Sequence, residues 1–439
     1  MPPVYAQTSL NPFLNLGMPL PGTMMETTPA FDPALIRGLQ IFPDEPLHLN
    51  FVMETGEDAL APDVKTKEYT RMIKYFLAAL TVPDDDMWVN LSPSQQEQII
   101  PEVFGQTEMG RDLLAQDYVL KQLTASLLYP EKGIGKEFWN QVRAKVKEKY
   151  GDIDIPMETF HKVWVVPDEA EVTVQDNIAF VTKSRLKVMI EEDYLALQSN
   201  TGSPAPQAPS TPENALVGEQ GNRGTGEQIK EIIREIILPE IEKEVNQGKH
   251  FATLRQVYHA LILATWFKRN LQKSFLGAVY VDRDKTVGVD VADKMVKYKI
   301  YQQYMNAFKQ GVFDFIKEEY DESTGEVVPR QYFSGGVKFA ERIKKVYKER
   351  AGGPDAAMLT HLKNKGEVVV TDLAVSDRRQ ASGARDDTDA AMLTQEGTMY
   401  YVPRLFYEVV NDGEHALAPL EALSRAFVIW LQGQDEVDE

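Results

Sequence analysis

The sequence predicts an α+β protein of more than one domain. Amphipathic helical patterns fill residues 69–150, and the apolar period then changes to the alternation typical of strands over 160–190. A stretch rich in Ser, Pro and Gly follows at 198–226, after which helical patterns resume. We therefore expect an N-terminal domain of helices with a small antiparallel sheet, a mainly α-helical second domain, and a short C-terminal strand-helix piece.

The chain has 439 residues, which is too many for one ordinary core. Shifts in composition divide it into six segments. These are a disordered N-terminus with the remnant of a signal (1–30), an α+β domain (31–197), a flexible linker (198–226), a helical domain (227–350), a second linker (351–396) and a C-terminal strand-helix piece (397–439). The last piece is too short for a core of its own, so we expect it to pack on another domain.

The elements of the first domain follow from periodicity and from turn residues. Pro83 lies just beyond an apolar stripe of helical spacing and is expected to end that helix. Asp176 and Asn177 tolerate the backbone angles of a tight hairpin between two alternating runs. Helices are expected over 69–80, 107–128 and 136–150, and strands over 47–53, 160–166, 171–175, 178–182 and 186–190.

The second domain is expected to consist of three helices. An apolar stripe runs from Ile229 to Val245, and Pro239 is expected to kink or split this helix. A second helix is expected over 252–276. The third, over 291–319, carries a heptad-like seam of Tyr, Met and Phe that we interpret as core.

The second linker contains a short repeat. Asp355–Thr360 and Asp389–Thr394 share the six residues Asp-Ala-Ala-Met-Leu-Thr. Two copies cannot bury the core of a solenoid. Two interpretations remain: a small tandem duplication, or a linear docking or processing motif whose Met-Leu pair is the apolar anchor.

Composition restricts the possible classes of function. The 66 acidic and 47 basic side chains give a net charge of −19, which argues against a general nucleic-acid binder because a polyanion is repelled. The absence of cysteine excludes disulfides, thiolate zinc sites, iron–sulfur clusters and thiol nucleophiles. No apolar run reaches the ~20 residues of a membrane span.

The first residues indicate a compartment. Val4 and Ala6 are small residues at the two positions that a signal peptidase reads, and Gln7 follows. We interpret this stretch as the tail of a secretory signal whose front is missing, and expect a periplasmic or secreted protein. The alternative is a chance match at the terminus of a cytoplasmic protein.

Four segments carry a resemblance to a known family. They are Trp88–Pro93, Gly110–Tyr118, Leu186–Tyr194 and Phe251–Trp266. Together they resemble an uncharacterised family of predicted exported proteins from candidate-phylum bacteria, over about residues 40–340. The resemblance implies export. The family has no assigned activity, so the resemblance supplies no functional residue.

The best metal candidate is a twelve-residue stretch between two expected helices, which matches part of a calcium-loop pattern. Its oxygen-bearing residues are Asp282, Asp284, Thr286, Asp290 and Asp293. Val287 occupies the position where the sharp turn of such a loop has Gly, and a terminal Asp reaches less far than Glu. We therefore favour a plain helix–helix loop, with calcium as the alternative and no other cofactor expected.

Motifs for catalysis are missing from the sequence. It contains neither Gly-x-Ser-x-Gly nor His-Glu-x-x-His, and His250 and His259 are nine residues apart, on opposite faces of a helix. Acidic runs at Asp84–Asp86 and Glu191–Asp193 could contain a glycosidase-type pair, but we expect them to be solvated.

These observations favour a non-enzymatic, exported interaction or structural protein whose partner is a protein or an envelope component. The alternative is a hydrolase that acts on envelope or extracellular polymers through paired carboxylates. The sequence does not predict an oligomeric state.

Overall fold

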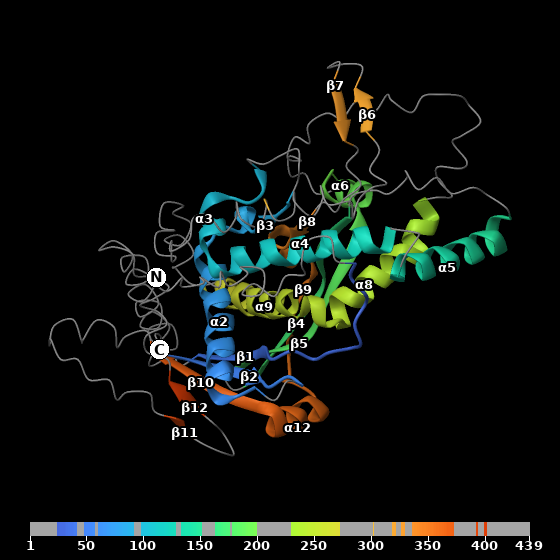
Figure 1. Ribbon diagram of the computed structural model, residues 1–439. Helices are drawn as coiled ribbons and strands as arrows, with labels where there is room; N and C mark the ends of the chain where they lie inside the picture. Colours follow the sequence, from blue (N-terminus) through green and yellow to red (C-terminus); the bar gives the residue numbers. More distant parts are fainter. Residues whose placement is uncertain are drawn as a thin grey trace, which may run out of the picture.

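The computed structural model describes residues 24–41, 48–57, 60–91, 98–128, 133–151, 163–175, 178–199, 230–272, 302, 318–321, 326–329, 336–372, 392–393 and 399–401. Within these residues, helices pack against one large mixed sheet (Figure 1). The expected α+β class is confirmed.

The sheet is larger than expected, with ten strands in which β11-β12-β10-β2-β1-β5-β4-β8-β3 are neighbours and β9 also pairs with β4. The strands are β1 (Leu35–Ile41), β2 (His48–Glu54), β3 (Trp88–Val89), β4 (Val163–Gln175), β5 (Ile178–Ile190), β8 (Gly336–Lys338), β9 (Tyr347–Ala351), β10 (Gly366–Asp372), β11 (Met392–Leu393) and β12 (Met399–Tyr401). β6 (Glu318–Asp321) and β7 (Glu326–Pro329) form a separate pair.

The expected small antiparallel sheet is therefore corrected. The β4–β5 hairpin is antiparallel and forms its centre, but β8 and β9 pair with β4 in parallel, and β12 does so with β10. Local sequence patterns do not show which strands pair in parallel. The strands β8, β9 and β12, which add the parallel pairing, come from residues 336–401, far along the chain from the hairpin.

The expected helices at 69–80, 107–128, 136–150 and 252–276 are present, with bounds shifted by a few residues. The helices are α2 (Pro62–Thr81), α3 (Glu102–Gln106), α4 (Glu108–Leu128), α5 (Gly133–Tyr150), α6 (Glu191–Ser199), α8 (Leu238–Gln247), α9 (Ala252–Gln272), α11 (Ala340–Val346) and α12 (Ala356–Lys365). Three shorter turns are η1 (Asp84–Asp86), η4 (Ile233–Ile237) and η5 (Lys249–Phe251).

Pro239 does not split its helix, because helical residues run without a break from 230 to 247. Pro has no N–H to donate, and the turn that precedes it widens to the π-helical pairing of η4 before α8 continues.

Helix α9 is the central helix of the fold. It packs against α2, α4, β1, β4 and β5, and Figure 1 shows it alongside α4 across the middle of the molecule. Val257, Ile262 and Leu263 have no exposed surface, and Tyr258 and Leu261 have at most 2%. A helix that is buried on most of its faces belongs to a core rather than to a surface.

One hydrophobic core joins residues from both expected domains. It contains side chains of β1, β2, α2 and α4 together with those of α8, α9 and α11. The expected division between 31–197 and 227–350 thus does not separate two cores within the described residues.

Two segments that were expected to be disordered are ordered. Residues 24–30 lie against α8 and η5, and residues 351–372 form the end of β9, α12 and β10. Val368–Val370 are β-branched residues of the kind that fill a central strand, and β10 pairs with β2 along its whole length. The linker expected at 198–226 lies outside the described residues, apart from its first two.

The two copies of the repeat differ in structure. In the first copy, Asp355 caps α12, because its Oδ1 accepts a hydrogen bond of 2.8 Å from the N–H of Met358. In the second copy, the described residues Met392 and Leu393 form β11. The same hexapeptide therefore supplies the start of a helix in one place and part of a strand in the other.

Candidate functional site

Polar side chains of α9 fill a seam in the sheet. β1 and β5 are paired over Gly38–Gln40 and diverge toward the start of β1. There Gln256 Nε2 donates to the carbonyl of Ala34 at 3.0 Å, and His259 Nδ1 donates to that of Ile36 at 3.2 Å. These bonds satisfy carbonyl groups that have no strand partner on that side.

The other nitrogen of His259 meets a serine. Ser184 Oγ lies 2.8 Å from His259 Nε2. The carbonyl of Ile36 can only accept, so Nδ1 carries the proton and Nε2 accepts from the hydroxyl. Burial, and then the charges of Arg37 and Arg255, hold the pKa of His259 well below its ordinary value.

This serine–histidine pair is a poor candidate for nucleophilic catalysis. A histidine that activates a serine must become an imidazolium. His259 would do so in a buried position near two arginines, and its Nδ1 partner is a carbonyl rather than a carboxylate. We therefore assign the pair to the fold, as a link between β1, β5 and α9.

Helix α8 covers the other part of the seam. Asn246 accepts a hydrogen bond from the N–H of Leu186 at 2.9 Å and donates to its carbonyl at 2.8 Å. Glu242 Oε2 accepts from the N–H of Val188 at 3.1 Å. Side chains here replace a neighbouring strand along the edge of β5.

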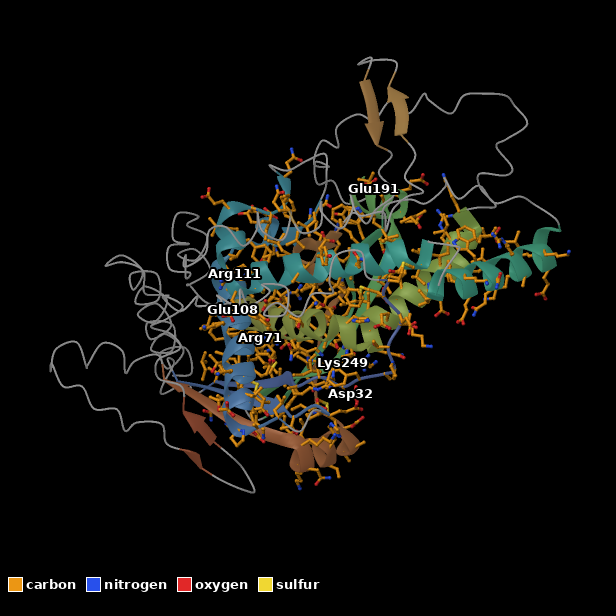
Figure 2. The ribbon with its side chains drawn as sticks, in the orientation of Figure 1. Asp32, Arg71, Glu108, Arg111, Glu191 and Lys249 are labelled. Atoms are coloured by element: carbon orange, nitrogen blue, oxygen red, sulfur yellow. The ribbon has the colours of Figure 1, made fainter. Side chains whose placement is uncertain are left out.

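A second polar group lies between α2, α4 and α9, and we call it the charged cluster. It consists of Glu68, Arg71, Lys74, Tyr75, Glu108, Arg111, Asp112 and Gln256. Figure 2 shows Arg71, Glu108 and Arg111 near one another where α2 passes α4. Its ionised side chains are partly exposed, whereas Tyr75 is fully buried and Gln256 is 4% exposed.

The charged cluster is held by contacts between its helices. Arg71 Nη2 donates to Glu68 Oε2 at 2.6 Å within α2, and to Gln256 Oε1 at 3.0 Å on α9. Tyr75 donates its hydroxyl to Asp112 Oδ2 on α4. The buried amide of Gln256 thereby holds the guanidinium of Arg71 in position.

Two further features mark the cluster. The Nε atoms of Arg71 and Arg111 are buried and have no hydrogen-bond partner within the described residues, so any contact with a partner must come from the exposed parts of these side chains. Burial raises the pKa of Asp112 to about 6, and Glu108 adds to the shift, while Arg71, Tyr75 and Arg111 oppose it. The carboxyl of Asp112 therefore changes charge near pH 6 rather than near pH 4.

One ion pair lies deeper in α4. Lys121 Nζ is 2.7 Å from Asp117 Oδ2, and neither side chain exposes more than 1% of its surface. The same oxygen accepts a hydrogen bond of 2.6 Å from the N–H of Leu91. This pair joins α4 to the segment that follows β3.

The acidic runs singled out in the sequence are partly paired. Asp84 contacts Lys268 at 2.9 Å and Lys344 at 2.8 Å, so it joins η1 to α9 and α11. The second run forms the first turn of α6, where Glu192 pairs with Lys230 and Asp193 with Arg234.

The calcium-loop candidates lie outside the described residues. These are Asp282, Asp284, Thr286, Asp290 and Asp293. In the part of the chain that the structure does describe, no three His, Asp or Glu residues are grouped to hold a metal ion. No described helix is long and apolar enough to cross a membrane.

Comparison with known proteins gives no relative. No family model, curated protein or solved structure matches this chain.

Proposed function

We propose that the chain is an exported, non-enzymatic interaction protein, and that the charged cluster is the face that meets a protein partner or an envelope component. The supporting observation is that charges of both signs are held in position with about a quarter of their side-chain surface exposed. Arg71 and Glu68 keep 29% and 25% of their side-chain surface, and Lys74 and Glu108 keep 23% and 31%.

Fixed, partly desolvated charges suit recognition better than mobile ones do. A side chain that is already held loses less conformational entropy on binding. Charges of both signs select complementary partners and increase the rate of encounter. Arg71 meets the first condition, because Gln256 orients its guanidinium while 29% of the side-chain surface stays exposed.

Arg111 is the residue at which to test this proposal. Changing Arg71 would also break its bond to α9, whereas Arg111 is partly exposed and no hydrogen bond from its side chain to α9 is seen within the described residues. Arg111→Gln removes one charge from the cluster. Arg143→Gln removes one from the exposed surface of α5 and is the matched control.

The experiment is affinity isolation from the envelope fraction of the native cells with the tagged full chain, quantified by mass spectrometry. Proteins that bind through the cluster should be retained by the wild type and by Arg143→Gln, and lost with Arg111→Gln. Equal recovery with all three chains would exclude this face as the binding site.

One observation favours the alternative, a hydrolase acting through paired carboxylates. Glu108 and Asp112 are one helical turn apart on α4, and the pKa of Asp112 is raised to about 6. A protonated acid beside a carboxylate is the arrangement of a glycosidase. Release of reducing ends from envelope polysaccharide by the wild type, and its loss in Asp112→Asn and Glu108→Gln, would support the enzyme.

Export is part of the same proposal and rests on Val4 and Ala6 of the sequence. Cell fractionation tests it independently of binding. An extracytoplasmic protein is expected, and recovery in the cytoplasm would contradict export without affecting the role of the cluster.

A further inference from the structure

Residues 25–34, which we call the N-terminal strap, lie in an extended course over the corner where α8 passes through η5 into α9. Phe31 N–H donates to the carbonyl of Gln247 at 2.8 Å, and Ala30 forms an antiparallel bridge with Gly248. The backbone of the strap is thus hydrogen-bonded to residues 247–248 in the same way as a strand that is added to the edge of a sheet.

A buried carboxylate recognises one side chain of the strap. Glu244 is 3% exposed, and its two oxygens accept from the N–H of Thr28 at 2.8 Å and from its hydroxyl at 2.6 Å. The N–H of Lys249 donates to the same hydroxyl at 2.6 Å. Thr28 therefore uses its backbone and its side chain in one small polar socket.

An aromatic side chain three residues later meets a cation. Lys249 Nζ lies 4.8 Å from the centre of the Phe31 ring. Arg255 donates to the carbonyl of Phe31 at 2.8 Å, and also to those of Gly248 and Val245. Figure 2 shows the neighbouring Asp32 and Lys249 on this side of the molecule.

The socket requires glycine at its centre. A Cβ on Gly248 would come within 2.1 Å of the carboxylate of Glu244. Any larger residue would displace the group that binds Thr28. The corner thus combines a buried carboxylate, a cation beside the aromatic ring and backbone groups that pair with an extended segment.

From these contacts we propose that the corner is a peptide-binding site and that the strap is its resident ligand. The site takes an extended segment with a hydroxyl residue followed three positions later by an aromatic one, the pattern of Thr28 and Phe31. A partner protein carrying this pattern exchanges with the strap. This inference does not rest on the function proposed for the charged cluster, although Gln256 connects Ala34 at the end of the strap to Arg71 of that cluster.

Because the strap belongs to the same chain, it competes at a high effective concentration. The test therefore uses the full chain carrying Thr28→Val and Phe31→Ala, which weaken the strap without shortening the protein. The probe is a fluorescent peptide of residues 24–33, and its binding is followed by anisotropy. The weakened chain should bind it at least tenfold more tightly than the wild type does.

Two further variants, made in the weakened chain, locate the peptide. Glu244→Gln should reduce its affinity at least tenfold, and Glu240→Gln, at an exposed position of α8, should leave it unchanged. If the double variant fails to fold, Thr28→Val alone serves with the same expectations. A folded weakened chain that binds no better than the wild type, or binding indifferent to Glu244, overturns the proposal.

Discussion

Ser184 Oγ and His259 Nε2 lie 2.8 Å apart and join strand β5 to helix α9. The imidazole is buried and neutral, and its other nitrogen is already bonded to β1. The hydroxyl is thus the donor that satisfies a buried acceptor. This relationship makes the pair part of the core, and its loss should appear in stability.

Ser184→Ala should lower the free energy of unfolding by about 1–3 kcal/mol, because Nε2 would be left buried without a donor. Urea unfolding of the full chain measures this change. Unchanged stability, together with loss of a hydrolytic activity, would instead identify Ser184 as a nucleophile.

Because His259 is buried and neutral, it should make the stability of the protein decrease as pH falls. Its pKa is lowered in the fold, so below pH ~6.5 the unfolded chain takes up a proton that the folded chain does not. Stability is lost as pH falls, by up to about 1.4 kcal/mol per pH unit. His259→Gln should remove this slope between pH 6.5 and 5, and an identical slope in wild type and variant would contradict the assignment.

The titration of Asp112 should change stability with pH in the opposite direction to that of His259, so that it stabilises the fold as pH falls. Its folded pKa of about 6 lies above the ordinary 3.8, so the folded chain gains a proton first as pH falls. Protonation of Asp112 therefore stabilises the fold fully below pH ~4, and this stabilisation is lost as pH rises through 6. The difference in the free energy of unfolding is about 3 kcal/mol at most.

Asp112→Asn removes that difference. The free energy of unfolding of Asp112→Asn, minus that of the wild type, should therefore be larger at pH 7.5 than at pH 4.5. Asp85→Asn, at an exposed position in η1, is the control and should show no such difference. A variant whose relative stability is the same at both pH values would show that Asp112 titrates normally.

The buried pair in α4 should respond to single and double changes differently. Lys121→Met leaves the carboxylate of Asp117 buried without its cation and should cost about 3–5 kcal/mol. Asp117→Asn combined with Lys121→Met removes both charges, while the amide oxygen can still accept from Leu91. The double variant should recover part of the loss, and strictly additive costs would rule out a direct coupling.

Local patterns predicted the helices α2, α4, α5, α8 and α9 and the β4–β5 hairpin, because their apolar periods are regular, whereas α3, α6, α11 and α12 were not predicted. β1 was missed, since the register shift between Ile36 and Gly38 breaks the alternation on which strand prediction depends. β10 was missed for a different reason. Its Val-Val-Val run is typical of a strand, but it is short and lies in a stretch rich in Gly, Asp and Arg, whose composition predicts a linker.

The charged cluster could not be predicted from sequence spacing. Arg71 and Asp112 are on different helices, and Gln256 comes from a third one far along the chain. One partial signal was present, the spacing of Glu108 and Asp112 by one helical turn. Burial raises the pKa of Asp112, and burial depends on packing that no local pattern contains.

The most direct test of the proposed binding face is the affinity of an isolated partner for three full-length chains, measured by titration calorimetry at low and high salt. Arg111→Gln should weaken binding at least tenfold, which is about 1.4 kcal/mol, and should reduce its salt dependence. Arg143→Gln should bind as the wild type does. Equal affinities for the wild type and Arg111→Gln would contradict a role for the charged cluster in binding.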